Sequence, residues 1–139
     1  FKVTTTLPDA LYDLQIPKLL LHPLIENCFK HAFNIRSPWL ISINGTLNKD
    51  CWTISVTDNG VGFNEEVLAE LNETIHTKQF SFASETNNKI GLFNIYYRLK
   101  IQYKENAVFE IRNNEGCGAT ITIGGRIKGG LLNDRKQDI

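Results

Sequence analysis

The segment DNGVGF, Asp58–Phe63, joins an acidic side chain to two glycines directly after the strand-like run WTISVT. A carboxylate only accepts hydrogen bonds, and glycine lets the main chain lie very close to another group. One interpretation is a site for a flat ligand, with Asp58 as a buried acceptor and Gly60 and Gly62 against the ligand. The alternative is a simple turn, because Asp-Asn-Gly is strong turn chemistry by itself.

A second group of polar side chains lies on a helix predicted over Pro17–Phe33 from apolar residues at three- and four-residue steps. At about 100° per residue, Asn27 and Lys30 share one flank, and His31 follows Asn27 by one turn. Glu26 can pair with Lys30 four residues later. The helix therefore offers a carboxylate, an amide and an ammonium along one edge, or alternatively an ordinary solvated ion pair of little energetic weight.

The elements that must position these groups follow from the periodicity of the chain. Alternating residues predict strands and three- to four-residue repeats predict helices. The order of these elements predicts a two-layer α/β domain with helices on one face of a mixed sheet. The predicted strands are Phe1–Leu7, Trp39–Leu47, Cys51–Thr57, Val108–Arg112 and Ala119–Ile123, and the helices are Pro17–Phe33, Glu65–Ile75 and Ile90–Ile101.

Two segments do not fit this pattern. His76–Lys89 is polar and aperiodic, which is typical of a disordered loop or a functional lid. The chain after Gly124 is rich in Gly, Lys and Asp, and we expect it to fray. The predicted organisation is one domain over residues 1–125, with a lid at about 63–89 and a flexible tail over 126–139.

Length and composition narrow the function further. The 139 residues suffice for one domain, and 15 basic side chains balance 15 acidic ones, so nothing in the charge favours a nucleic acid partner. Three widely spaced cysteines without CxxC argue against a zinc site and fit a reducing compartment. The chain lacks a GxxxxGK[ST] phosphate loop and a signal peptide, and its first residue, Phe1, suggests a domain cut from a longer protein.

Three ordered motifs together resemble the ATP-binding domain of the GHKL superfamily, and most closely that of the LytS/YesM-like sensor histidine kinases. IPKLLLHPLIENCFKHAF is similar to their N box, GLFNIYYRL to their Gly-Leu-x-Asn helix, and GCGATITI to their closing Gly-Lys-Gly-Thr strand. The resemblance spans roughly Phe1 to Gly125. It implies an α/β (α+β) two-layer Bergerat-type fold, in which about three helices cover one face of a mixed, mostly antiparallel sheet.

For the nucleotide base, the resemblance implies that Asp58 accepts the exocyclic amine of adenine. A carboxylate at this place selects an amine over the carbonyl of guanine. Gly60 and Gly62 would let the main chain pass close to the base, and Asn59 would contact the ribose or the lid.

For the phosphates, the resemblance implies that the amide oxygen of Asn27 binds Mg²⁺, a cation that prefers oxygen ligands. Lys30 would meet the phosphates as a point charge, and His31 would bond a phosphate or the lid. Gly91 and Leu92 would lie where the N-terminus of a helix meets the triphosphate.

The chain departs from the family pattern in several places. Before Gly91 it reads NNKI where the family has further glycines, although Lys89 adds a charge there. In the closing strand Ala119 replaces the usual Thr, and Thr120 is next along. Glu26 directly precedes the N-box Asn, and it is the candidate for a base or water-orienting group.

The resemblance implies the catalytic domain of a two-component sensor histidine kinase, with ATP and Mg²⁺ as cofactors. The γ-phosphate would pass to a histidine on an upstream dimerisation domain absent from this chain, with a response regulator downstream. The parent would be a homodimeric, membrane-anchored bacterial sensor with this domain in the cytoplasm. The alternatives are a degenerate nucleotide-binding or protein-interaction module without kinase activity, and another GHKL-type ATPase.

Overall fold

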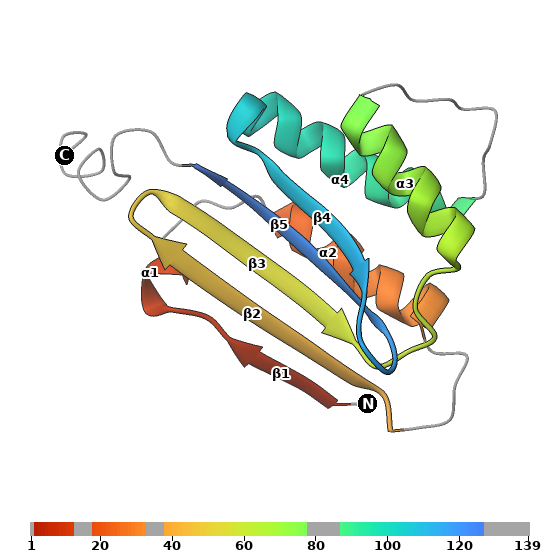
Figure 1. Ribbon diagram of the computed structural model, residues 1–139. Helices are drawn as coiled ribbons and strands as arrows, with labels where there is room; N and C mark the ends of the chain where they lie inside the picture. Colours follow the sequence, from red (N-terminus) through yellow and green to blue (C-terminus); the bar gives the residue numbers. More distant parts are fainter. Residues whose placement is uncertain (1, 13–17, 33–37, 78–86, 127–139) are drawn as a thin grey trace, which may run out of the picture.

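The sheet organises the domain. The computed structural model describes residues 2–12, 18–32, 38–77 and 87–126. Its strands lie in the order β1-β2-β3-β5-β4, and only the β1–β2 pair is parallel. Figure 1 shows these strands side by side, with β1 at one edge and β4 at the other. Their bounds are β1 Lys2–Thr6, β2 Leu40–Asn48, β3 Cys51–Asp58, β4 Val108–Asn113 and β5 Ala119–Arg126.

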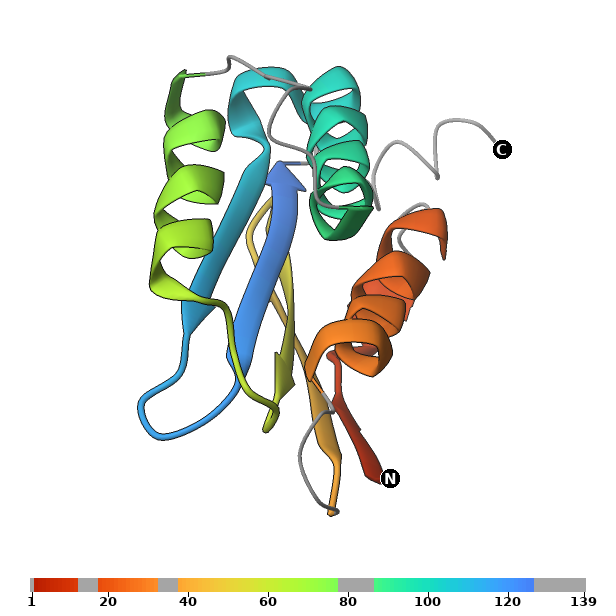
Figure 2. The ribbon, with the colours of Figure 1, turned by 90° about the vertical axis from the view of Figure 1, so that its right-hand side faces the viewer.

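The long helices pack against the sheet. Helices α2 and α4 lie next to each other, and α3 lies beyond α4, near β4 (Figures 1 and 2). The hydroxyl of Tyr96 on α4 donates to the carbonyl oxygen of Ile75 on α3 at 3.3 Å. The helices are α1 Asp9–Tyr12, α2 Lys18–Asn27, the π-helix η1 Cys28–Ala32, α3 Glu65–Thr77, α4 Asn87–Tyr103 and the short 3₁₀-helix η3 Lys104–Asn106.

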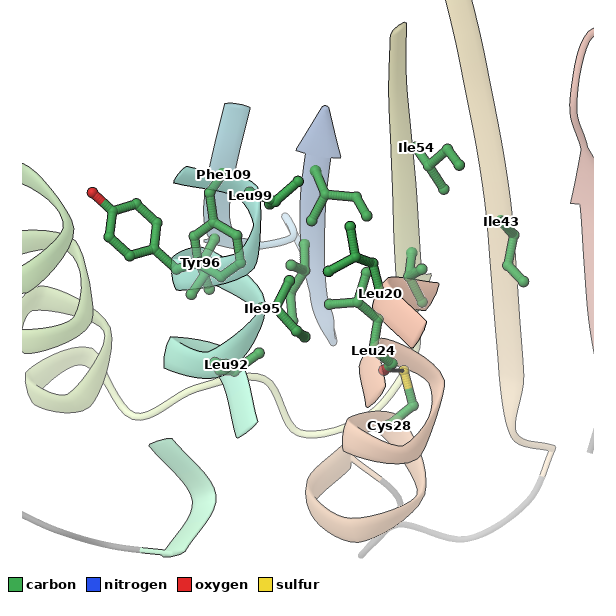
Figure 3. Close-up of a cluster of buried hydrophobic side chains, with 14 of the residues drawn as sticks. Leu20, Leu24, Cys28, Ile43, Ile54, Leu92, Ile95, Tyr96, Leu99 and Phe109 are labelled. Atoms are coloured by element: carbon green, nitrogen blue, oxygen red, sulfur yellow. Dashed lines mark hydrogen bonds between the residues drawn. The ribbon is translucent and has the colours of Figure 1, made fainter. Parts of the chain in front are cut away.

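The core lies between the helices and the sheet. On β3 the buried residues alternate, because successive side chains of a strand point to opposite faces. Leu20 and Leu24 on α2 and Cys28 at the start of η1 follow one another at four-residue steps and are almost fully buried. Figure 3 shows these side chains facing the strands and the apolar side of α4. The four-residue spacing on α2 therefore directs Cys28 toward the sheet.

These elements confirm the predicted fold class, a mixed and mostly antiparallel sheet with helices on one face. Pro23 lies inside α2 and does not begin a second helix. The predicted helix over Pro17–Phe33 changes character at Cys28, where the α-helix gives way to η1.

The first part of the predicted lid at 63–89 contains the predicted helix. Within it, α3 is an ordinary amphipathic helix with Leu71 buried in the core. Residues 78–86 lie outside the described residues, so the lid itself stays a prediction. The predicted boundary at residue 125 falls just inside β5, where Arg126 Nε donates to Asp50 Oδ2 at 3.0 Å, and 127–139 also lie outside the described residues.

Candidate functional site

Asp58 is the centre of the candidate site. It ends β3 on the side that faces the helices, and only 7% of its surface is exposed. Its Oδ1 accepts the backbone N–H of Gly60 at 2.9 Å and that of Ala119 at 3.3 Å. Its Oδ2 accepts the thiol of Cys28, with the sulfur 3.7 Å away. A buried carboxylate is therefore held in a fixed orientation by donors from three segments of the chain.

The thiol of Cys28 completes this arrangement from the helical side. Burial in the core, reinforced by the negative charge of Asp58 and the hydrogen bond to it, raises the pKa of Cys28 to about 12. The thiol therefore stays protonated at neutral pH and serves as a donor. Its sulfur also lies 3.5 Å from the carbonyl oxygen of Leu24 one turn earlier.

The loop between β4 and β5 supports the backbone of Asp58. Asn114 Nδ2 donates to the carbonyl oxygens of Asp58 at 3.1 Å and of Cys117 at 3.2 Å. Gly118 has a φ of +83°, and a Cβ there would overlap the Asp58 carbonyl oxygen and lie 2.6 Å from its carbonyl carbon. The backbone of this loop at Gly118 therefore packs directly against the backbone of Asp58.

The glycine segment after Asp58 is fixed by Asn113. Asn113 Oδ1 accepts the N–H of Phe63 and its Nδ2 donates to the carbonyl of Phe63, each at 2.8 Å. Gly62 has a φ of +74°, and a Cβ there would come within 2.9 Å of Asn113 Oδ1. The glycine at position 62 thus has a local reason in the turn itself, as well as its predicted role beside a ligand.

We expect Asn113→Ala to destabilise the domain by about 1–3 kcal/mol, because both polar backbone groups of Phe63 lose their partners. Urea denaturation measures the loss, and hydrogen exchange at the Phe63 amide should accelerate. The matched control is Glu110→Ala, an exposed position on the same strand. Equal effects of the two substitutions would show that the Asn113 clamp contributes nothing.

Both the oxygen and the nitrogen of the Asn59 side-chain amide make hydrogen bonds to the backbone. Its Oδ1 accepts the N–H of Leu40 and its Nδ2 donates to the carbonyl of Pro38, each at 2.8 Å. It therefore fastens the start of β2 to the end of β3. The predicted contact with ribose or the lid stays a prediction, and the amide keeps a second N–H and a second lone pair that could make it.

The N-box residues lie where α2 becomes η1. The wider π-helical winding begins at Cys28, so the angular placement at 100° per residue holds only as far as Asn27. Asn27 is half-buried at the end of α2, and Lys30 is exposed on η1. His31 also lies on η1, but its side chain is outside the described residues.

Glu26 does not make the predicted pair with Lys30. Its Oε1 lies 3.0 Å from Nε2 of His22, one turn earlier, and both side chains are more than half exposed. The structure thus places Glu26 on the solvent side of α2, away from the face that carries Cys28. Its role as a base stays a prediction.

Thr120 is not brought together with Asp58. It pairs in register with Thr57, and the two hydroxyls lie 3.0 Å apart on the sheet face opposite the core. Its hydroxyl also donates to Asn114 Oδ1 at 2.6 Å. Because neighbours on a strand point to opposite faces, it is Ala119 that lies on the side of Asp58. Thr120 therefore reaches the site only through Asn114.

The helix predicted over Ile90–Ile101 begins earlier than expected. Helix α4 begins at Asn87, because NNKI continues the helix where further glycines would interrupt it. The backbone N–H groups without an intrahelical acceptor thus belong to the turn before Gly91. Leu92 is buried in the core, and the side chain of Lys89 lies outside the described residues. Phosphate binding by Gly91 and Leu92 stays a prediction.

Sequence reasoning missed four residues that shape the site, namely Cys28, Asn113, Asn114 and Gly118. The pattern Gly116-x-Gly118 in the closing turn was a usable signal. The two asparagines before that turn carry no periodic signal, and their partners lie 50 and 56 positions away.

The chemistry of the donor set fits a nucleotide and a hard cation. The rigid carboxylate of Asp58 suits a flat ligand that carries an amine. Among the described residues no group of three or more His, Cys, Asp or Glu could hold a metal ion. A Mg²⁺ here would rely on phosphate and water oxygens plus one or two protein oxygens, which matches a single amide such as Asn27.

In the described part of the chain no helix is long and apolar enough to cross a membrane.

Sequence comparison identifies relatives of this chain. Sensor protein LytS of Oceanobacillus iheyensis is 32% identical over 108 residues, which are 77% of this chain and 18% of that protein. Sensor histidine kinase YesM of Bacillus subtilis is 30% identical over 123 residues, which are 88% of this chain and 20% of that protein. The chain thus spans about a fifth of the length of these relatives.

Structural comparison gives the same fold. The blue-light activated histidine kinase of Erythrobacter litoralis matches with a TM-score of 0.60 at 15% identity, over 94% of this chain and 36% of that chain. The nucleotide-free catalytic domain of histidine kinase ThkA matches with 0.59 at 15% identity, over 89% and 79%. The family model for histidine kinase-, DNA gyrase B- and HSP90-like ATPases matches residues 13–127, most of the chain, and the chain belongs to this family.

Proposed function

We propose that this chain is the ATP-binding catalytic domain of a sensor histidine kinase. The observation that carries the proposal is the buried carboxylate of Asp58, which is held by Gly60, Ala119 and Cys28 at the end of β3. Family membership and the kinship with sensor kinases support it.

Asp58 selects the base in this proposal. Its Oδ2 accepts the exocyclic amine of adenine, and a guanine would place a carbonyl oxygen against the same carboxylate. A buried acceptor without a donor costs about 1–3 kcal/mol, and the repulsion between two acceptors adds to that. Gly60 and Gly62 bring the main chain against the base.

Residues of α2 and η1 would hold the phosphates and the metal. Asn27 would supply an oxygen to Mg²⁺, Lys30 would meet the phosphates as a point charge, and His31 would bond a phosphate or the lid. When bound, Mg²⁺ supplies charge neutralisation on the phosphates. The N-terminal turn of α4, which includes Lys89, presents backbone N–H groups to the triphosphate, and Gly91 and Leu92 follow directly after it.

Phosphoryl transfer here depends on positioning and charge more than on covalent chemistry by the domain. The acceptor is a histidine on an upstream dimerisation domain of the same protein, which acts as a homodimer and passes the phosphoryl group to a response regulator. Glu26 is the candidate for orienting or deprotonating the acceptor. The parent is a membrane-anchored sensor, and this domain lies in the cytoplasm.

The test is a calorimetric titration of the domain with ATP and GTP, with and without Mg²⁺, on wild type and on Asn27→Ala. We expect ATP to bind in the micromolar to millimolar range, GTP to bind far more weakly, and Mg²⁺ to strengthen ATP binding. Asn27→Ala should remove the Mg²⁺ dependence and keep the preference for adenine.

The outcomes separate the rival functions. A folded wild-type domain that binds no ATP would be a protein-interaction module, with NNKI before Gly91 as the altered feature. Steady release of phosphate without any histidine acceptor would instead indicate a GHKL-type ATPase. Either result contradicts the kinase proposal.

A further inference from the structure

We propose that Cys28 is a positioning residue for adenine recognition, because its thiol donates to Asp58 Oδ2 and holds the carboxylate for the exocyclic amine. This inference deepens the proposed function and rests on it. Cys28 reaches Asp58 from the helical layer, 30 positions earlier in the sequence, and both side chains are buried.

The hydrogen bonds of Asp58 show which oxygen is available to a ligand. A carboxylate offers roughly four lone-pair directions, two on each oxygen. Oδ1 already accepts two backbone N–H groups, from Gly60 and Ala119. Among the described residues, Oδ2 accepts only the thiol of Cys28. One acceptor direction is therefore left, on Oδ2, and it is the one that an exocyclic amine would use.

The thiol matters because the two oxygens are otherwise held unequally. Two backbone N–H groups hold Oδ1, whereas among the described residues the Cys28 thiol is the donor to Oδ2. The thiol lies 3.7 Å from Oδ2 and adds a restraint on the oxygen that the amine would meet. Pre-organisation of this kind improves affinity because the ligand need not order the group that binds it.

Cysteine suits this position for a second reason. Leu20 and Leu24 precede it on the same buried stripe of α2, so the side chain must be small and tolerate apolar neighbours. A thiol satisfies both conditions and still carries a weak donor. The carbonyl oxygen of Leu24 competes for the same proton at 3.5 Å, but the carboxylate is the stronger acceptor because it is charged.

A ligand without the exocyclic amine distinguishes a positioning role of Cys28 from a purely structural one. Purine riboside 5′-triphosphate keeps the ring and the phosphates of ATP but lacks the exocyclic amine. If Cys28 acts through Asp58 on the amine, its removal weakens ATP and spares this analogue. If it only fills space, its removal affects both ligands equally.

The experiment measures the dissociation constants of both ligands for wild type, Cys28→Ala and Cys28→Ser by calorimetry. We expect Cys28→Ala to weaken ATP roughly 3- to 10-fold, the range of one modest hydrogen bond, and to leave the analogue unchanged. Cys28→Ser keeps a donor and should retain ATP binding close to wild type. The control is Cys51→Ala, an exposed cysteine at the opposite end of β3.

Equal weakening of both ligands by Cys28→Ala, or no weakening of ATP, overturns the inference while the kinase proposal stands. Loss of ATP binding in Cys28→Ser with the fold intact overturns it too. If the wild-type domain binds no ATP at all, the proposed function itself fails, and the inference fails with it.

Discussion

Asp58→Asn should lower the affinity for ATP roughly 100-fold or more while the domain stays folded. The amide has the same shape as the carboxylate, and its oxygen can keep the two backbone donors, Gly60 and Ala119, on the Oδ1 side. The NH₂ group then takes the place of Oδ2. A donor would face the exocyclic amine of adenine, which is itself a donor.

The same substitution should change the choice of nucleotide. A guanine presents a carbonyl oxygen where adenine has its amine, and the new NH₂ group at position 58 can donate to it. We therefore expect the ratio of ATP affinity to GTP affinity to fall by a larger factor than the ATP affinity itself, because GTP gains a hydrogen bond that ATP loses. Calorimetric titration of both nucleotides into wild type and Asp58→Asn measures this ratio.

Thermal unfolding of the variant is the control, since a drop in affinity means little if the protein has melted. The Cys28 thiol would then also face an NH₂ group, which adds a small local penalty. Unchanged ATP affinity in a folded variant would place adenine elsewhere and remove the main support for the proposed site.

The sheet was predictable because its signals are local. Trp52, Ile54 and Val56 alternate with polar residues, and a period of two is read directly from the sequence. The turn at Asn48-Lys49-Asp50 ends one strand and begins the next, and Lys49 takes the positive φ of 59° that such a tight connection requires. The prediction of Asp58 as a buried acceptor depended on the family resemblance, because Asp-Asn-Gly after a strand is also strong turn chemistry.

The ends of the helices were less predictable. No glycine or proline marks a boundary between Asn87 and Ile90, so the start of α4 depended on the family pattern and was placed too late. Residue propensities do not distinguish an α-helix from a π-helix, so the change at Cys28 had no signal in the sequence. That change decides which side chains share a face beyond Asn27.

The supports of Asp58 could not be predicted from periodicity. Asn114 contacts residue 58 across 56 positions, and only the folded sheet brings the two together. Thr120 was predicted as a site residue from its adjacency to the family position, and the alternation of β5 turns its side chain to the face opposite Asp58. Strand register therefore outweighs sequence proximity in assigning such residues.

Gly118→Ala should destabilise the domain by about 2–5 kcal/mol. A left-handed conformation costs an ordinary residue roughly 1–2 kcal/mol, and Gly118 has a φ of +83°. Overpacking adds about 1–3 kcal/mol, because the new Cβ would meet the main chain of Asp58, which has no rotamer to change. Thermal unfolding measures the loss, which we expect to lower Tm by roughly 10 °C.

Gly116→Ala is the matched control, because it separates the cost of the positive φ from the steric clash of the new Cβ. Gly116 has a φ of +94° in the same turn, but a Cβ there would have no neighbour within 4 Å. Gly116→Ala should therefore lower the stability only by the cost of the positive φ, about 1–2 kcal/mol, and keep the affinity for ATP. Gly118→Ala should also weaken ATP, since it displaces the backbone that carries the Asp58 carboxylate. Equal destabilisation by the two substitutions would mean that the closing turn does not press on Asp58, and that the donors Gly60, Ala119 and Cys28 hold the carboxylate without help from that contact.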